Sequence, residues 1–420
     1  MTTVRRPGGR YFRLLAENAD LRRLYLARLV SFGGDWFLLV PMLALVHEIS
    51  NSPLLTAAVL TANTLPAFIL SPLGGVLADR MNRKRIMVWS SLAASVASAS
   101  LLFVNTSAVR SAGLGVPLIL GGMSVLAGLS ALLTPASSAS LPAVVAPADL
   151  GNASFLLEST WGTMAAVGAA LGGVVATAFG RETAVAMDSL SFLVAAFLIS
   201  RVRSNLSFGQ KKSTDDPAGL RAAVGYVAQK PPVAALLTSK AGFAIFGAGA
   251  VALLPILALE SFQAGDAGIG WLLAARGIGV VIGPFVIRRL VGGTDRAVLA
   301  SIGICMAIWG VSYLGTAVAP ALLLAAGAVL LGHAGAGSQW SFSSYGLQLY
   351  TDPAVKGRVF GLDFAAVTLT STISQLLFGW LATLYPVRSV FLGLAIAAIA
   401  FGLTWRRVTS RYWAVAPHAA

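Results

Sequence analysis

Charged side chains are scarce in this sequence, and a few of them stand inside long apolar stretches. Of its 420 residues, 57% are hydrophobic and 11% are charged, whereas about a quarter of an ordinary soluble domain is charged. An ionisable side chain at bilayer depth is costly, so it usually faces a cavity or a partner. The residues that could bind a ligand or carry a proton on this argument are Asp35, Glu158, Lys240, Arg276 and His333.

Asp35 is the deepest of the acids. It stands eleven residues after Leu24, which is about 16 Å along a helix and close to the middle of a bilayer core about 30 Å thick. At that depth its carboxyl group could exchange a proton, pair with a cationic ligand or balance a fixed arginine. Arg276 is the candidate arginine, because it stands at a similar depth in a later apolar stretch.

Glu158 and Lys240 each lie about 10 Å from one end of an apolar stretch. Opposite charges at equal depth could form an inner gate, or each side chain could reach toward water instead. Asp188 and Asp363 stand nearer the ends of their stretches. We expect only local roles at helix termini for these two acids.

Other polar and aromatic residues are candidates for a ligand cavity. His333 could carry a proton because imidazole titrates near neutral pH, although a lone buried histidine is more often simply hydrogen-bonded. Trp36 and Gln339, with Trp161, Trp271 and Trp340, would suit a bulky, partly aromatic ligand. Packing between helices is the alternative. Cys305 is a single cysteine in an apolar stretch, so a disulfide or a cysteine metal site is not expected.

These residues must be positioned by helices that cross a membrane, since about 20 helical residues span the bilayer core. The apolar stretches predict an all-α integral membrane protein with twelve spans. Their expected ranges are 24–48, 54–77, 86–107, 115–137, 154–180, 183–200, 233–259, 268–287, 297–318, 321–345, 359–384 and 387–405. Gly is frequent in them, with 44 residues in the chain, which suits helices that pack closely in lipid.

The distribution of positive charge predicts the orientation. Lysine and arginine concentrate on the cytoplasmic side of membrane proteins. Of the 30 such residues, three (Arg110, Arg181 and Arg388) fall in loops expected outside and three (Arg28, Lys240 and Arg276) fall within spans. The others lie on the side of the N-terminus, so we expect a multi-pass inner-membrane protein with both termini in the cytoplasm. This pattern also explains the net charge of +14 without a nucleic-acid partner.

The chain is expected to form two six-helix halves. Residues 201–232 are polar and contain Pro231 and Pro232, so they predict a cytoplasmic linker between a half at 1–200 and a half at 233–420. The segment 141–151 aligns without gaps on 347–357, and each follows the fourth span of its half. Two halves of the same orientation are typical of a transporter built from parallel repeats.

The stretch GGVLADRMNRKR, residues 74–85, falls between the second and third spans. It resembles the cytoplasmic loop signature of the major facilitator superfamily (MFS), G-x-L-a-D-R-x-x-R-K/R. The matching residues are Gly75, Leu77, Asp79, Arg80, Arg83 and Lys84. A merely basic inside loop is the alternative. The resemblance implies the MFS fold, alternating access, and a loop that locks the two halves on the cytoplasmic face, with Gly75 giving a small surface near a span end.

Four further stretches resemble the MFS branch of enterobactin-type siderophore exporters and macrolide efflux pumps. They are RRLYLARLVSFGGDW, LPAVVAPADLGNAS, AMDSLSFLVAAF and DPAVKGRVFG. Two departures bear on the mechanism, because drug antiporters of the superfamily often carry an arginine in the fourth span and a G-x-x-x-G-P-x-x-G-G motif in the fifth. Here 118–133 has no ionisable residue, and the fifth span reads MAAVGAALGG.

The resemblance implies a secondary active transporter, with proton-coupled efflux of a drug, antibiotic or siderophore-like molecule as the expected activity. Such an antiporter would contribute to multidrug resistance. The expected partners are the substrate, protons or another coupling ion, and the bilayer; no cofactor or metal is expected, and the chain is expected to work as a monomer. An MFS importer or a lysophospholipid transporter is the alternative. An integral membrane enzyme is disfavoured because no H-E-x-x-H, G-x-x-x-x-G-K-[ST] or G-x-S-x-G motif occurs.

Overall fold

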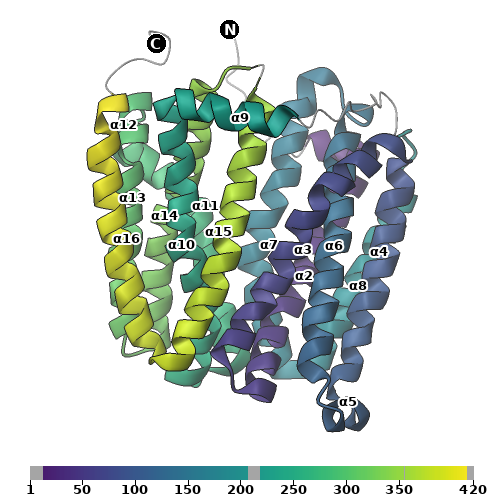
Figure 1. Ribbon diagram of the computed structural model, residues 1–420. Coiled ribbons are helices and arrows are strands. Elements are labelled where there is room, and N and C mark those ends of the chain that lie inside the picture. Colours follow the sequence, from purple (N-terminus) through teal and green to yellow (C-terminus); the bar gives the residue numbers. More distant parts are fainter. Residues whose placement is uncertain (1–12, 207–217, 354, 414–420) are drawn as a thin grey trace. The chain divides into compact units, whose positions relative to one another are not determined.

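The computed structural model describes residues 13–206, 218–353 and 355–413, without the side chains of Asp79, Phe155, Glu158, Ser159, Trp161 and residues 218–222. Throughout these ranges the chain is helical and contains no strand (Figure 1). Twelve of the described helices are long and apolar enough to cross a membrane. The predicted fold class and number of spans are therefore confirmed.

The first six spans come from six long α-helices, with a short helix, α5, between the third and the fourth span. Five of the predicted spans coincide with single helices to within several residues, and the third extends through a 3-10 turn at Leu101–Asn105. The helices are α2 (Ala19–Ser50), α3 (Pro53–Arg80), α4 (Arg83–Ser100), the short α5 (Ser107–Ser111), α6 (Gly115–Ser140), α7 (Leu150–Phe179) and α8 (Arg181–Ser200).

The second set of six spans follows a short helix, α9 (Ala218–Gln229), which forms in the predicted linker. Pro231 and Pro232 occupy the first turn of the next helix, where a missing N–H costs no hydrogen bond. The helices are α10 (Pro231–Ile256), α11 (Gly265–Leu290), the short α12 (Asp295–Ala300), α13 (Ile302–Val318), α14 (Leu322–Tyr350), α15 (Lys356–Leu384) and α16 (Val387–Thr409).

The chain divides into two compact units. Unit 1 comprises Met1–Met42 and Ala62–Thr214, and unit 2 comprises Leu43–Thr61 and Asp215–Ala420. The division after Thr214 falls within the predicted linker, in the segment 207–217 that lies outside the described residues. The ends of α2 and α3 pack with unit 2, where the Thr61 hydroxyl donates to Gln375 Oε1 at 3.1 Å. The sequence did not indicate this exchange.

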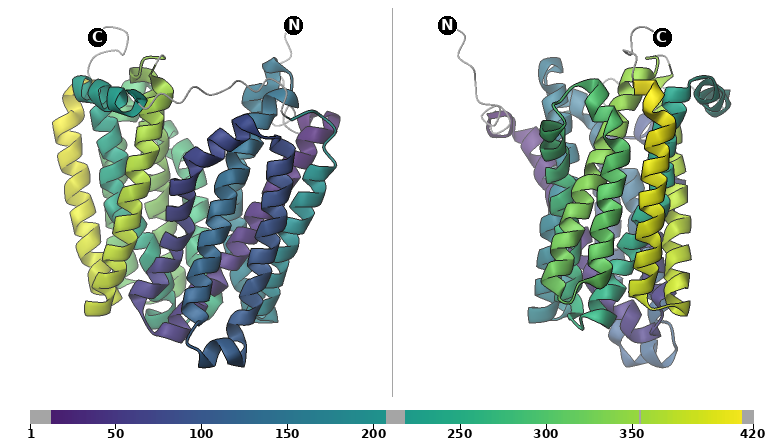
Figure 2. Two further views of the ribbon diagram at one scale, coloured as in Figure 1. Left: turned by 45° about the vertical axis from the view of Figure 1, so that its right-hand side comes forward. Right: turned by 90° about the vertical axis from the view of Figure 1, so that its left-hand side faces the viewer.

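Corresponding helices pair in the same way in the two units. In unit 1, α4 packs against α6 and α8; in unit 2, α13 packs against α14 and α16. These are the third, fourth and sixth spans of each half. Figure 2 shows the yellow helix α16 running beside other helices of unit 2. The shared pairing is what a parallel repeat requires.

Glycines allow other helices of each unit to approach closely. In unit 1, a Cβ on Gly172 of α7 would lie 2.8 Å from the Cα of Phe37 on α2. In unit 2, a Cβ on Gly283 of α11 would collide with the backbone of Ala334 on α14. A larger residue at either position would force the helices apart, in line with the small residues that membrane helices use at their contacts.

Candidate functional site

Asp35 lies near the middle of the 32-residue helix α2. Its side chain is half-buried, and among the described residues no hydrogen bond or ion pair reaches it. A carboxyl group left without a partner at this depth is energetically costly unless it holds a proton or meets a ligand. The structure therefore leaves Asp35 available for either role.

Two glycines next to Asp35 bring other helices of unit 1 close to α2. A Cβ on Gly33 would lie 3.3 Å from the sulfur of Met164 on α7. A Cβ on Gly34 would collide with Asp188 Oδ1 and with Ser191 Oγ on α8. Because Gly34 has no side chain, α8 can place Asp188 against the turn of α2 that carries Asp35.

Asp188 is fully buried, with 0% of its surface exposed. Its Oδ2 accepts a hydrogen bond from Ser98 Oγ on α4 at 2.6 Å, and its Oδ1 has no hydrogen-bond partner among the described residues. The expected local role at a helix terminus is wrong, because this side chain reaches sideways into the contact between helices. Counting residues from the end of a span gives depth but not the direction of the side chain.

Trp36 and Glu158 belong to the same unit. Trp36 packs against α7, since a Cβ on Gly168 would lie 2.8 Å from the Trp36 Cβ. The packing alternative therefore applies to at least part of this side chain. The side chains of Glu158 and of Trp161 lie outside the described residues, so their roles stay predictions.

Lys240 of α10 has a partner other than the one expected. Its Nζ lies 2.6 Å from Asp363 Oδ2 on α15, and both side chains are buried, with 2% and 7% exposed. The ammonium group also lies 4.8 Å from the centre of the Trp340 ring. The local role expected for Asp363 is therefore wrong, because its side chain pairs across two helices. A gate between Lys240 and Glu158 stays a prediction, since the side chain of Glu158 lies outside the described residues.

Gln339 and His333 of α14 are both satisfied within unit 2. Gln339 Nε2 donates to Ser239 Oγ at 3.3 Å, and His333 Nδ1 lies 3.1 Å from the carbonyl oxygen of Val329. Both side chains are buried, with 1% and 4% exposed. The structure thus supports the hydrogen-bonded alternative for His333, and it places Gln339 in a contact between α14 and α10.

Arg276 of α11 lies deep in unit 2 and is half-buried. Its Nε has no hydrogen-bond partner among the described residues, and the nearby hydroxyl of Tyr313 on α13 has none either. The stacked rings of Trp309 and Tyr313, with centres 4.2 Å apart, form the adjoining wall of α13. Because Arg276 and Asp35 belong to different units, the pair between them stays a prediction.

The loop signature has its glycine contact one residue earlier than expected. A Cβ on Gly75 would have open space, whereas one on Gly74 would collide with the carbonyl oxygen of Ala131 on α6. Arg80 is exposed. The side chain of Asp79 lies outside the described residues, so its role stays a prediction.

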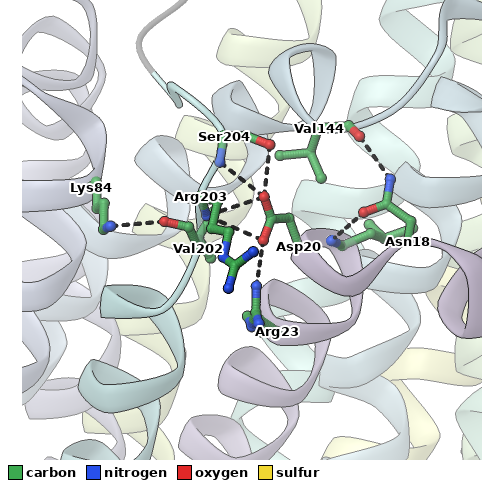
Figure 3. A network of polar contacts seen from close by, with 9 residues as sticks. Asn18, Asp20, Arg23, Lys84, Val144, Val202, Arg203 and Ser204 are labelled. Carbon is green, nitrogen blue, oxygen red and sulfur yellow. Dashed lines mark hydrogen bonds and ion pairs between the residues drawn. The ribbon is translucent and has the colours of Figure 1, made fainter.

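The basic residues of this loop hold backbone carbonyls of unit 1. Arg83, which is buried, donates to the carbonyl oxygens of Ala139 at 2.7 Å and Leu206 at 3.2 Å. Lys84 donates to the carbonyl oxygen of Val202 at 2.8 Å (Figure 3). The loop thus anchors the chain as it leaves α8 at the start of the predicted linker.

Asp20 holds the same segment from the opposite side, a role that the sequence analysis missed. As Figure 3 shows, its carboxylate accepts hydrogen bonds from the Ser204 backbone N–H and hydroxyl, both at 2.8 Å, and from the Arg203 N–H at 3.1 Å. Arg23 on the same helix lies 2.7 Å from it. An acid in the first turn of a helix was the available signal, but that position alone indicates only an interaction with the helix dipole.

No group of three or more His, Cys, Asp and Glu side chains within the described ranges could hold a metal ion. The polar side chains near mid-span form two separate sets: Asp35 with Asp188 and Ser98 in unit 1, and Arg276 with Tyr313 in unit 2. The acids of the first set suit a proton or a cation. The donors of the second set suit an anionic or hydrogen-bond-accepting group.

Comparison with known proteins gives one family match along nearly the whole chain. The family described as "Transmembrane secretion effector" matches residues 15–416. A protein of Bacillus amyloliquefaciens named as a bacilysin exporter, BacE, is 29% identical over 181 residues. The match covers 43% of each chain, so less than half of that relative is represented. An MFS-type transporter of Bacillus subtilis, YfiS, is 24% identical over 405 residues, or 93% of each chain.

Solved structures share the fold at low sequence identity. A POT family transporter in complex with 5-aminolevulinic acid has a TM-score of 0.75 at 9% identity, over 95% of this chain and 97% of that one. A bacterial homologue of the iron transporter ferroportin, in an inward-facing state, has a TM-score of 0.68 at 17% identity, over 92% and 98%. At these identities the similarity concerns the fold alone.

Proposed function

The chain belongs to the transmembrane secretion effector family of the major facilitator superfamily, and from this premise we propose that it exports a small organic molecule in exchange for protons. The observation that carries the proposal is Asp35, an acid at the middle of α2 without a partner among the described residues. Such a residue is a candidate for coupling because its charged form is unfavourable at that depth.

The exchange takes place by alternating access. Substrate entering from the cytoplasm displaces the proton from Asp35 to the cytoplasmic side, and the transporter turns outward and releases the substrate. Asp35 then binds a proton from outside, and the protonated carrier returns. One proton enters for each substrate molecule that leaves, so the proton gradient drives the export.

The available energy is sufficient for accumulation against a gradient. Moving one charge through the membrane potential is worth about 2.3 kcal/mol per 100 mV. A tenfold concentration ratio costs about 1.4 kcal/mol. A single coupled proton therefore supports more than a tenfold gradient of a neutral substrate.

Two kinds of similarity support export as the direction. The sequence resembles the branch of siderophore exporters and macrolide efflux pumps, and relatives matched over 43% of their length are named as bacilysin exporters. We infer a drug, antibiotic or siderophore-like substrate in the inner membrane of a bacterium. We propose Trp36 as a substrate-binding residue of unit 1 and Arg276 as a substrate-binding residue of unit 2.

The test is accumulation of a macrolide, a catecholate siderophore and a dipeptide antibiotic in cells with and without the protein. We expect at least one compound to accumulate less in expressing cells, and a protonophore to abolish the difference. Higher accumulation in expressing cells would indicate import. A difference that persists with the protonophore would contradict proton coupling.

A further inference from the structure

We propose that Asp35 and Asp188 hold one proton between them, so that the proton-binding site of unit 1 is a carboxyl pair on α2 and α8. This inference rests on the proposed function, because it names the second group through which the proton is held. From its position in the sequence, Asp188 is expected to have no role in transport. The packing of α2 against α8 brings Asp188 close to Asp35.

The contact between α2 and α8 brings the two acids together. The two helices share one apolar core, in which Leu24 and Ala27 of α2 pack with Ala195 and Ile199 of α8. Above this core, Gly34 lies directly against Asp188 Oδ1. Since Asp35 is the next residue on α2, the two acids lie on adjoining turns of packed helices.

Asp188 has one carboxyl oxygen whose capacity to accept a hydrogen bond is not used within the described residues. One carboxyl oxygen is bound by the Ser98 hydroxyl at 2.6 Å, and the other, Oδ1, faces α2 without a hydrogen-bond partner among the described residues. A fully buried carboxylate normally has its oxygens hydrogen-bonded or paired with a cation. A proton shared by the two carboxyl groups can form the missing hydrogen bond to Asp188 Oδ1, so that no cation is needed.

In the part of the chain that the structure describes, no charged group of the surrounding helices forms an ion pair with Asp35 or Asp188. Arg28, two turns before Asp35 on α2, is directed to α6, where it donates to Ser138 Oγ at 3.3 Å. Arg83 and Lys84 at the start of α4 are bound to backbone carbonyls. On α7, Glu158 is the titratable residue in the span, and its side chain lies outside the described part of the chain. On α2, Asp35 directly follows Gly34, the residue against which Asp188 packs.

Two neighbouring carboxylates in this environment cannot both be ionised without strong repulsion, so they titrate as a pair. With one proton bound, the pair carries a single charge and shares it between two helices. The two acids differ in their exposure to solvent, because Asp35 is half-buried whereas Asp188 is fully buried. Protons therefore enter and leave by making and breaking an O–H bond at Asp35, while Asp188 is the partner that stabilises the bound proton.

The test uses protons alone, so that it does not depend on knowing the substrate. Infrared difference spectra of the purified full chain in phospholipid nanodiscs report the C=O stretch of protonated carboxyl groups as pH is changed. The variants are Asp35→Asn, Asp188→Asn and the double variant. Glu182→Gln is the matched control, since Glu182 is an exposed acid on the same helix, α8, bound to Asn105 at 2.9 Å.

We expect the Asp188→Asn substitution to shift the pH midpoint of the Asp35 carboxyl band by about one pH unit or more, and Asp35→Asn to do the same to the Asp188 band. The double variant should lose both bands, and Glu182→Gln should leave the Asp35 and Asp188 bands at their wild-type midpoints. If each single variant removes its own band and leaves the other at its original midpoint, the two acids titrate independently and the inference is wrong.

Two further measurements keep the result unambiguous. Should Asp188→Asn fail to fold, Ser98→Ala removes only the hydrogen bond to Asp188 Oδ2, and it should move the same bands; unchanged bands would contradict the pair. Protonophore sensitivity of wild-type efflux tests the proposed function separately. Wild-type efflux that does not depend on the proton gradient would refute proton coupling and with it the proposed function. Proton-coupled efflux together with independent titration of Asp35 and Asp188 would refute only the shared proton.

Discussion

Two of the buried acids, Asp188 and Asp363, are neutralised differently. Asp363 lies 2.6 Å from Lys240, so its charge is balanced by a cation of the same unit. Asp188 has a hydroxyl on one oxygen and no cation among the described residues. A fixed ion pair suits a structural role, while an acid without a cation needs a proton, and this difference separates the two residues functionally.

At the residue scale we predict that Lys240→Met destabilises the protein by about 3–5 kcal/mol, because it leaves the Asp363 charge buried without a partner. Thermal unfolding of the detergent-solubilised protein measures this change. The double variant Lys240→Met/Asp363→Leu removes both charges and should recover most of the loss. Equal stability of the wild type and Lys240→Met would show that the pair contributes nothing.

At the scale of elements, the segment that follows α8 is held from two sides. Asp20 at the start of α2 binds the N–H groups of Arg203 and Ser204, while Arg83 and Lys84 before α4 bind the carbonyls of Leu206 and Val202. The basic residues of the loop signature thus have a defined task within unit 1. They fix the point at which the chain leaves the first six spans.

We predict that Asp20→Ala releases this segment. Each lost hydrogen bond to a charged group is worth about 1.5–3 kcal/mol, so the amide hydrogens of Arg203 and Ser204 should exchange with solvent at least roughly tenfold faster. Hydrogen–deuterium exchange with mass spectrometry measures the rate on peptides covering 198–206. Glu182→Gln, at the opposite end of α8 in the same unit, is the control and should leave those peptides unchanged. Equal exchange in Asp20→Ala and the wild type would contradict the role.

The sequence predicted the elements well because hydropathy and length act along the chain. It placed twelve spans, and the segments 141–151 and 347–357 indicated a repeat that the helix pairing supports. It did not predict lateral neighbours, since these depend on which face of each helix meets another. Asp188 against Gly34, Lys240 with Asp363 and Asp20 with Ser204 all required the packing to be known.

At the scale of the whole molecule, the positive charges predict that both termini and the linker face the cytoplasm. Cys305 is fully buried, so replacing it with serine gives a background for single-cysteine labelling. Lys211→Cys should react with a membrane-impermeant maleimide only in inside-out vesicles, and Arg110→Cys only in intact cells. Labelling of Lys211→Cys from outside intact cells would contradict the predicted topology and place the linker on the outer side of the membrane.

At the scale of the whole transport cycle, we propose that the proton gradient drives export through Asp35. The most direct measurement is efflux from proteoliposomes of a compound that the wild type exports, with and without an imposed proton gradient, for the wild type and Asp35→Asn. We expect Asp35→Asn to lose uphill efflux and to keep part of its downhill exchange, because coupling is lost while the cavity survives. Uphill, protonophore-sensitive efflux by Asp35→Asn would contradict it and place the proton elsewhere, with Glu158 the next residue to test.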